Sequence, residues 1–346
     1  MGRLEILIPK SISQSRLEQL RSVIGKGPVL ILTHDSPDPD ALSSGLGLAT
    51  LFRQAWGISS RLVYSGLVAR AENRAMLRFL TPEWEQHDVL EGFEQYSALV
   101  LVDSQPRAGN NRLPEHIWPQ VVIDHHNPIR ESLQVVPYVD VRPEVGATVS
   151  MVYQYLDAAG IVPGPTLATA MFYGLQTDTR GLARGASEID EAVYVKLLSW
   201  LDRKKLIDVE QVGVSQDYFR AFNQGLQAAR VYGKVVLAYL GPMSRPDLAA
   251  EMADVLIRLE TARAAFCLGS YEDNLHLSLR TKGIDTDAGR LVQQVVASLG
   301  KAGGHGAIAG GQVPIAGKDL DTLVAEIKRR FLTLLGEEDA GVPLLG

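Results

Sequence analysis

The sequence predicts an α/β protein with a mostly parallel, doubly wound sheet in its N-terminal domain and a smaller α/β domain at its C-terminus. Two observations support this fold class. Predominantly apolar runs alternate with segments of helical periodicity between residues 28 and 201, as they do in folds built from strand, helix and strand units. A polar stretch follows, and the alternation restarts at residue 233, which indicates a second domain.

The elements of the N-terminal domain follow from these local patterns. Short apolar runs predict buried strands at 28–33, 61–64, 98–102 and 120–123. Apolar residues that recur every three or four positions predict helices at 11–24, 41–56, 72–80, 145–159, 167–175 and 187–201. Because strands and helices alternate, we expect parallel strands joined by right-handed crossovers.

The C-terminal part repeats the alternation on a smaller scale. We expect strands at 234–240, 263–268 and 275–279, helices at 247–259, 287–299 and 320–334, and a loop in the glycine-rich segment 300–306. The predicted organisation is a first domain over 1–203, a linker over 204–231, a second domain over 232–336 and a loose tail over 337–346.

The composition is that of an ordinary globular protein. Lys and Arg total 34 against 40 Asp and Glu, a net charge of -6, which argues against a partner such as long duplex nucleic acid. The chain lacks an apolar run of membrane-spanning length and the apolar core of a signal peptide, so we expect no membrane partner and a cytoplasmic location. The single Cys267 excludes an internal disulfide. The oligomeric state stays open, and a homodimer is among the states that the sequence allows.

Metal-ligating side chains follow three of the predicted strands, and another ends a predicted helix. They are His34, Asp38 and Asp40 after the first strand, Asp103 after the third, Asp124, His125 and His126 after the fourth, and Asp178 at the helix end. Carboxyl ends of parallel strands meet at one edge of a sheet, so we expect these groups to converge. A single aspartate after a strand is commonly a turn or helix cap. The combination favours divalent cations, which need several oxygen ligands and, as a pair, a bridging carboxylate.

Four segments, in this order, resemble the motifs of the DHH phosphoesterase superfamily, which is named after its Asp-His-His signature. They are residues 34–41 (HDSPDPDA), 102–104 (VDS), 124–126 (DHH) and 177–179 (TDT). Residues 278–280 (SLR) and 303–305 (GGH) resemble the DHH-associated second domain. The resemblance covers nearly the whole chain and points to the subgroup of oligoribonucleases of very short RNA, adenosine bisphosphate phosphatases and cyclic dinucleotide phosphodiesterases.

The resemblance implies two bound metal ions and a role for each motif residue. Manganese is the expected metal, with Mg²⁺ or Co²⁺ as alternatives. One ion would be held by His34, Asp38 and Asp103, and the second by Asp40, His125 and Asp178, with Asp103 bridging the two.

The same resemblance implies the catalytic and substrate-binding residues. His126 would face the scissile phosphate, and Asp124 would orient the histidine pair. The residues expected to bind substrate in the second domain, across a cleft that closes, are Arg280, Gly303, Gly304 and His305. Lys301 and Ala302 interrupt the glycine run that the oligoribonucleases carry, which makes a contact with phosphate a firmer expectation than a contact with a nucleobase.

The leading hypothesis is a Mn²⁺-dependent phosphodiesterase or phosphatase. Its expected substrates are short oligonucleotides, adenosine 3′,5′-bisphosphate, or cyclic or linear dinucleotides. A polyphosphate or pyrophosphate hydrolase would need the same metal site without contacts to a base. A protein that binds nucleotides without catalysis and regulates a partner is the alternative from a different class.

Overall fold

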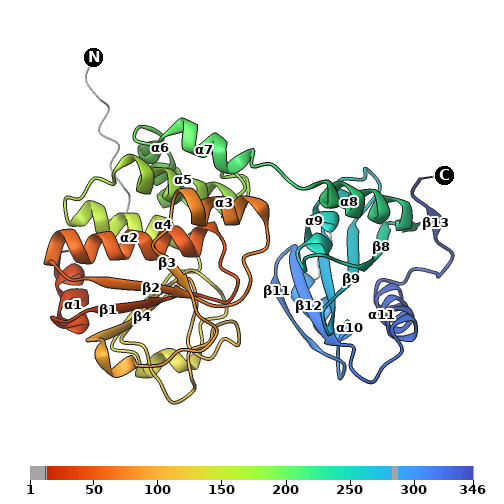
Figure 1. Ribbon diagram of the computed structural model, residues 1–346, viewed down its shortest axis with the longest axis horizontal. Helices are drawn as coiled ribbons and strands as arrows, with labels where there is room; N and C mark the ends of the chain where they lie inside the picture. The colour runs from red at the N-terminus through yellow and green to blue at the C-terminus, as the bar shows by residue number, and fades with distance from the viewer. Residues whose placement is uncertain (1–11, 13, 283–286, 346) are drawn as a thin grey trace. The chain divides into compact units, whose positions relative to one another are not determined.

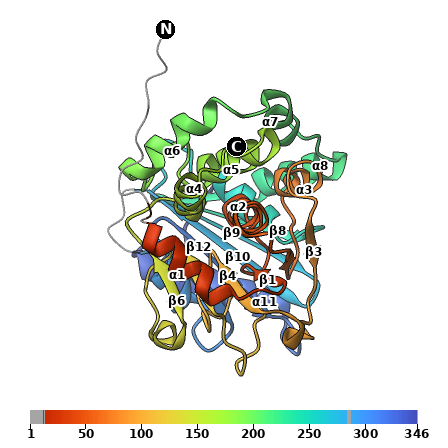
Figure 2. The ribbon, with the colours of Figure 1, turned by 90° about the vertical axis from the view of Figure 1, so that its left-hand side faces the viewer.

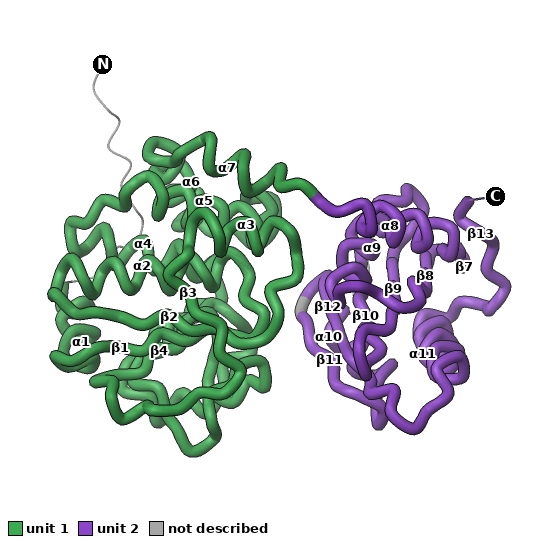
Figure 3. The backbone as a smooth tube through the Cα atoms, viewed as in Figure 1, with its two compact units in different colours: residues 1–213 green, residues 214–346 purple. Residues whose placement is uncertain are grey.

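The computed structural model describes residue 12 and residues 14–282 and 287–345, in a chain that divides into two compact units, Met1–Gly213 and Val214–Gly346 (Figure 3). The division falls inside the expected linker 204–231. Most of that stretch is helical, since α7 (Arg203–Glu210) packs within the first unit and α8 (Gln216–Ala228) packs within the second. The segment that joins the two helices is therefore much shorter than the expected linker.

The first unit is built on a six-stranded sheet with the order β3-β2-β1-β4-β5-β6, in which all pairings are parallel. Its strands are β1 (Val29–Leu32), β2 (Ser60–Tyr64), β3 (Trp84–Gln86), β4 (Ala98–Val102), β5 (Val121–Asp124) and β6 (Tyr138–Val141). The order reverses between β1 and β4, and the predicted α/β fold with a mostly parallel sheet is confirmed. The sequence pattern does not predict the edge strands β3 and β6, because both are short and mix polar with apolar residues.

Helices cover one face of this sheet, whereas irregular segments cover the other (Figure 2). The helices of the unit are α1 (Gln14–Ile24), α2 (Pro39–Trp56), α3 (Ala71–Phe79), α4 (Thr148–Ala158), α5 (Pro165–Asp178), α6 (Glu188–Leu198) and α7. On the opposite face, Leu32, Leu101 and Val122 pack against segments that include two 3-10 helices, η1 (Phe93–Gln95) and η2 (Glu131–Val135). The central strands β1 and β4 are apolar throughout because both of their faces are buried.

The second unit contains a seven-stranded mixed sheet with the order β11-β12-β10-β9-β8-β7-β13. Its strands are β7 (Arg230–Tyr232), β8 (Val235–Pro242), β9 (Ala264–Tyr271), β10 (Asn274–Thr281), β11 (Lys301–His305), β12 (Ile308–Pro314) and β13 (Val342–Pro343). α8 and α9 (Leu248–Leu256) share one apolar core with the sheet, and α10 (Ala288–Val295) and α11 (Leu320–Leu335) share another. Over the part of the chain that the structure describes, each helix is too short or too polar to cross a membrane.

Two expectations for the second unit are wrong. The glycine-rich segment is largely an edge strand rather than a loop, because β11 pairs with β12 from Lys301 to His305. The expected loose tail contributes β13, which pairs with β7, and the Leu344 N–H donates to the Ala229 carbonyl oxygen at 2.9 Å. In both cases the backbone partners lie elsewhere in the unit, and a local pattern of side chains does not reveal them.

Candidate metal centre

The residues predicted to bind metal lie where β1, β4 and β5 end, in the middle of the first sheet. Figure 1 shows β1 and β4 side by side in this sheet. β4 pairs with both β1 and β5. His34 lies two positions after β1, Asp103 directly follows β4, and Asp124 is the last residue of β5. The strand order reverses at this edge, which is where open α/β sheets bind their ligands.

One group of donors comprises His34, Asp38 and Asp103. His34 Nε2 lies 3.5 Å from Asp103 Oδ2 and 4.0 Å from Asp38 Oδ1. The other ring nitrogen, Nδ1, lies 3.0 Å from the Asp35 carbonyl oxygen, so in the neutral ring Nδ1 carries the hydrogen and Nε2 offers its lone pair. Asp38 caps α2, because its Oδ1 accepts the Ala41 N–H at 3.0 Å, and this contact holds the carboxylate in place.

A second group comprises Asp40, His125 and Asp178. His125 Nε2 lies 3.3 Å from Asp178 Oδ2 and 4.0 Å from Asp40 Oδ2, while its Nδ1 lies 3.1 Å from the Val145 carbonyl oxygen. Asp178 is the last residue of α5, and the Arg184 guanidinium donates to its backbone carbonyl oxygen at 2.8 Å. His125 is thus held like the histidine of the first group, with Nε2 turned toward the carboxylates.

Asp103 lies between the two groups. Its Oδ2 faces His34, and its Oδ1 lies 3.7 Å from His125 Nε2. The residue has a φ of 55°, in the left-handed region that aspartate tolerates better than most residues, and its N–H donates to the Ile123 carbonyl oxygen at 2.9 Å. One buried carboxylate therefore presents an oxygen to each group, as a bridging ligand would.

The N-terminus of α4 completes the centre, and the sequence analysis missed this contribution. The N–H groups of Thr148 and Val149 donate to the two carboxylate oxygens of Asp40, each at 2.7 Å. The Thr148 hydroxyl donates to Asp103 Oδ1 at 2.7 Å. The free N–H groups and the dipole of a helix N-terminus stabilise a buried carboxylate. The sequence predicts the helix itself, but its contact with Asp40, 108 positions away, has no local signal.

The chain's own groups leave the charges of this centre poorly balanced. Burial, followed by repulsion from Asp103 and Asp178, raises the pKa of Asp40 well above its usual range. Burial and the charge of Asp38 raise the pKa of Asp178 to about 6. Burial disfavours protonation of His34, but Asp103 and Asp38 outweigh it and raise the pKa of His34 to about 9. Burial also disfavours the Asp103 carboxylate, yet the surrounding histidines lower its pKa. Divalent cations would relieve the repulsion among these carboxylates.

His126 differs from His125 in its contacts. Its Nδ1 lies 2.8 Å from Asp124 Oδ1 and 3.7 Å from Asp103 Oδ1. Its side chain is 36% exposed, against 13% for His125. Burial disfavours protonation of His126, but Asp103 and Asp124 outweigh it and raise the pKa of His126 to about 10. His126 is therefore a partly exposed, cationic ring beside the two groups, although Asp103, His125 and His126 also lie close enough to share an ion.

These donors fit a pair of divalent cations. Each group offers one imidazole Nε2 and several carboxylate oxygens, and the ligand atoms of each group lie within 4.8 Å of one another. The closest nitrogen to oxygen separations, 3.3 Å and 3.5 Å, are those expected for donors bound about 2.1 Å from a common ion. Imidazole combined with carboxylates suits ions such as Mn²⁺.

The residues expected to bind substrate lie in the second unit. Gly303 and Gly304 are part of β11, as is His305, whose side chain lies outside the described part of the structure. Arg280 is buried, and its guanidinium donates to Asp254 Oδ1 at 2.5 Å and to Ser278 Oγ at 3.0 Å. The guanidinium thus has internal partners, and its contact with substrate stays a prediction.

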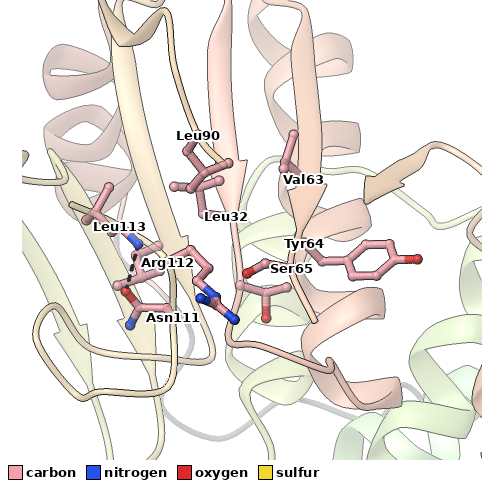
Figure 4. A pocket seen from close by; sticks show the side chains of 10 residues that line it. Leu32, Val63, Tyr64, Ser65, Leu90, Asn111, Arg112 and Leu113 are labelled. Atoms are coloured by element: carbon pink, nitrogen blue, oxygen red, sulfur yellow. Dashed lines mark hydrogen bonds between the residues drawn. The ribbon is translucent and has the colours of Figure 1, made fainter. Parts of the chain in front are cut away.

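Two cavities of the first unit lie outside the metal centre. The smaller one, about 10 Å³, lies beside the ends of β1 and β2 and is lined by Leu32, Val63 and Arg112 among others (Figure 4). It has room for about one water molecule. The larger one, about 210 Å³, is lined in part by Arg61 and His87. The residues that line these two cavities include no member of the two donor groups.

Family models match both units of the chain. Residues 28–175 match the DHH family, N-terminal domain, and residues 233–333 match the DHHA1 domain. The bifunctional oligoribonuclease and PAP phosphatase NrnA of Thermus thermophilus is 31% identical over 330 residues, which are 92% of this chain and 94% of that protein. The chain therefore belongs to the DHH phosphoesterase superfamily, and the resemblance found in its motifs is confirmed.

Two other relatives match smaller shares of their own length, and one solved structure shares the fold. An uncharacterised protein of Methanocaldococcus jannaschii is 33% identical over 292 residues, which are 84% of this chain but only 59% of that protein. A probable manganese-dependent inorganic pyrophosphatase of Streptococcus agalactiae is 26% identical over 176 residues, 50% of this chain and 55% of that protein. The crystal structure of an exopolyphosphatase-related protein from Bacteroides fragilis has the same fold, with a TM-score of 0.73 at 16% identity over 94% of this chain and 97% of that one.

Proposed function

We propose that this protein hydrolyses phosphoester bonds of short nucleotides and uses two divalent metal ions to do so. The observation that carries the proposal is the position of Asp103, whose carboxylate oxygens face His34 on one side and His125 on the other. Metal ions bound in the two groups would lower the pKa of a coordinated water and neutralise charge on the phosphate. The family of the chain supports an ester of phosphoric acid as the substrate.

The chain's own residues would position the reactants. Asp103, held by the Thr148 hydroxyl at 2.7 Å, would keep the two metal sites at a constant separation. His126, hydrogen-bonded to Asp124 through Nδ1, would face a phosphate oxygen or the leaving group. A cationic ring at that position stabilises developing negative charge and can donate a proton. The proposed reaction needs no covalent bond between the protein and the substrate.

Manganese is the proposed metal, and short nucleotides are the proposed substrates. Support for Mn²⁺ comes from the imidazole and carboxylate donors and from the probable manganese-dependent pyrophosphatases among the relatives. Support for short nucleotides comes from the relative named as an oligoribonuclease and PAP phosphatase, which aligns with both units of the chain. The net charge of -6 also favours a small substrate over a long nucleic acid.

Hydrolysis of pyrophosphate or polyphosphate is the second candidate. It is favoured by the pyrophosphatase relatives, which match half of this chain. The proposed metal site would serve either reaction, because both require attack on a phosphorus atom between charged oxygens. A substrate without a base would need only the metal centre of the first unit, whereas a nucleotide would call for contacts from the second unit.

A side-by-side activity screen with added Mn²⁺ tests this proposal. The substrates are bis-p-nitrophenyl phosphate, di- to pentanucleotides, adenosine 3′,5′-bisphosphate, cyclic dinucleotides, pyrophosphate and polyphosphate. We expect turnover of at least one nucleotide and loss of that turnover when a chelator is added. Turnover of pyrophosphate or polyphosphate alone would favour the second candidate. Metal binding without turnover of any substrate would contradict both and favour a nucleotide-binding regulator.

A further inference from the structure

The Gln105 side chain hydrogen-bonds both the Asp-His-His segment and the backbone of Arg130. Gln105 follows Asp103 by two positions, and its side chain is buried, with 4% exposed. Its amide nitrogen donates to Asp124 Oδ2 at 2.8 Å and to the His126 carbonyl oxygen at 3.0 Å. Its amide oxygen accepts the Arg130 N–H at 2.8 Å. Every hydrogen of the side-chain amide is therefore engaged.

These contacts determine which way the amide of Gln105 points. The nitrogen side faces two acceptors, a carboxylate oxygen and a carbonyl oxygen, while the oxygen side faces a backbone N–H donor. A flipped amide would place oxygen against oxygen and N–H against N–H, so only one orientation satisfies the three partners. The side chain consequently acts as a rigid link rather than an adaptable one.

The link matters because of where the Asp124 carboxylate lies. Asp124 is 0% exposed, and a buried carboxylate needs hydrogen bonds to both oxygens to avoid a large desolvation cost. Its Oδ1 is bonded to His126 Nδ1 at 2.8 Å, and its Oδ2 accepts from Gln105. Removal of the amide would leave Oδ2 unsatisfied and free the carboxylate to rotate, which would change the direction of the His126 ring.

We propose that Gln105 is a positioning residue. Its hydrogen bonds fix the side chains of Asp124 and His126 relative to the two donor groups. The inference rests on the proposed phosphoester hydrolysis, since it assigns to Gln105 an effect on that reaction through His126. Gln105 would contact neither metal nor substrate. The alternative is that Gln105 only ties the segment around Arg130 to the rest of the unit and supports the fold.

Two substitutions separate these roles. Gln105→Glu keeps the size of the side chain and an oxygen for the Arg130 N–H, but it removes both donors and places a carboxylate against Asp124. Gln105→Met removes all three hydrogen bonds at nearly constant volume. If Gln105 only tied the segment around Arg130 to the unit, the Glu variant would keep more activity than the Met variant. If Gln105 positions Asp124, the Glu variant would keep the least activity, because the two carboxylates repel each other.

The matched control is Gln120→Met. Gln120 lies at the other end of β5, and its amide bonds the Leu99 N–H at 2.7 Å and the Trp118 carbonyl oxygen at 3.2 Å. It therefore makes the same kind of contacts in the same sheet without touching the metal centre. Thermal unfolding of all variants reports any general loss of stability, which should be similar for Gln105→Met and Gln120→Met.

The kinetic test uses Mn²⁺-loaded protein and bis-p-nitrophenyl phosphate. We expect Gln105→Met to lower kcat by roughly 10- to 100-fold, the scale of a lost partner of a catalytic group, with Gln105→Glu lower still. The KM and the Mn²⁺ affinity from calorimetry should stay within about twofold of the wild type. In a His126→Ala background, Gln105→Met should lower kcat no further, because the two residues would act as one unit. Additive losses, or a Glu variant as active as the wild type, would overturn the proposal.

A second measurement does not depend on turnover. In metal-free protein labelled with ¹⁵N in histidine, the His126 signals, assigned by their loss in His126→Ala, should move in both Gln105 variants and stay in place in Gln120→Met. Unchanged His126 signals would overturn the positioning role even if the wild type proved inactive. An inactive wild type with displaced His126 signals would instead refute the proposed hydrolysis and leave the structural link in place.

Discussion

Two regions of the molecule hold buried charge in opposite ways. At the edge of the first sheet, Asp40, Asp103 and Asp178 gather around two histidines, and burial with mutual repulsion raises the pKa of Asp40 and Asp178. In the second unit the buried guanidinium of Arg280 meets the Asp254 carboxylate at 2.5 Å. The positive charge of Arg280 is compensated by a carboxylate of the chain itself, whereas the carboxylates of the first unit would be compensated best by a divalent cation. A buried charge without internal compensation is thus the better guide to a ligand site.

The largest effect is expected from Asp103→Asn. The amide keeps the shape of the side chain and can still accept from Thr148, but it cannot bridge two cations. We expect loss of both metal equivalents, measured by calorimetry and elemental analysis, and a fall in kcat on the order of 10³-fold. Asp217→Asn, on the exposed α8 surface, is the control. A variant of Asp103 with normal metal content and activity would show that the two groups of the first unit do not act as a two-metal centre.

A smaller fall in kcat is expected from His126→Ala. Because His126 is placed beside the metal sites rather than within them, kcat should fall by roughly 10²-fold, the scale of a lost general acid. Metal content should stay near that of the wild type. His87→Ala serves as the control, because His87 is half-exposed, follows the edge strand β3 and belongs to neither donor group. Loss of one metal equivalent in His126→Ala would instead place this ring among the ligands, in the group it forms with Asp103 and His125.

The unbalanced charge of the first region should also make metal binding depend on pH. His34, with its pKa raised to about 9 in the metal-free protein, holds a proton at neutral pH, and a cation must displace that proton. The apparent Mn²⁺ affinity should therefore fall by up to about tenfold per pH unit below pH 9. The dependence should steepen below about pH 6, where Asp178 is also protonated. Calorimetry from about pH 5 to 9, in buffers of different ionisation enthalpy, measures the released protons. An affinity that does not vary with pH would contradict the assignment of His34.

The smallest effect on the metal centre is expected from Asp254→Asn. This change removes the charge that faces Arg280 in the second unit, so the free energy of unfolding should fall by about 1–3 kcal/mol. Mn²⁺ binding should not change, because the region is compensated within itself. Thermal unfolding and calorimetry of the same sample check both statements. A loss of metal equivalents in this variant would break the distinction between the two regions.

Much of the metal centre could be predicted from the sequence, because its components are local. An apolar run that stops at Asp103 or at Asp124 identifies both a strand and the polar groups at its end. The parallel arrangement of the strands then implies that these ends meet. The structure brings together the same donors, in two groups that share Asp103, while their binding of metal remains to be measured.

Other parts could not be predicted, because the deciding contacts are distant in the chain. The glycine-rich segment 300–306 suggests a loop, yet its backbone groups find partners on β12 and form β11. Contact between Arg280 and substrate stays a prediction, but the hydrogen bond from its guanidinium to Asp254 on α9 has no signal in the local sequence. In both cases the local sequence is compatible with two conformations, and the packing of the second unit selects one.

The sequence by itself determined the fold class, the strands that carry the ligands and the chemical identity of the donors, because these follow from hydrophobic patterns and residue types within short segments. Only the tertiary structure decided how the donors are held. The backbone N–H of Thr148 reaches Asp40 across 108 positions, and Gln105 reaches Asp124 across 19. A hydrogen bond requires two groups within about 3 Å of each other, and that proximity arises only when the sheet and its helices have packed.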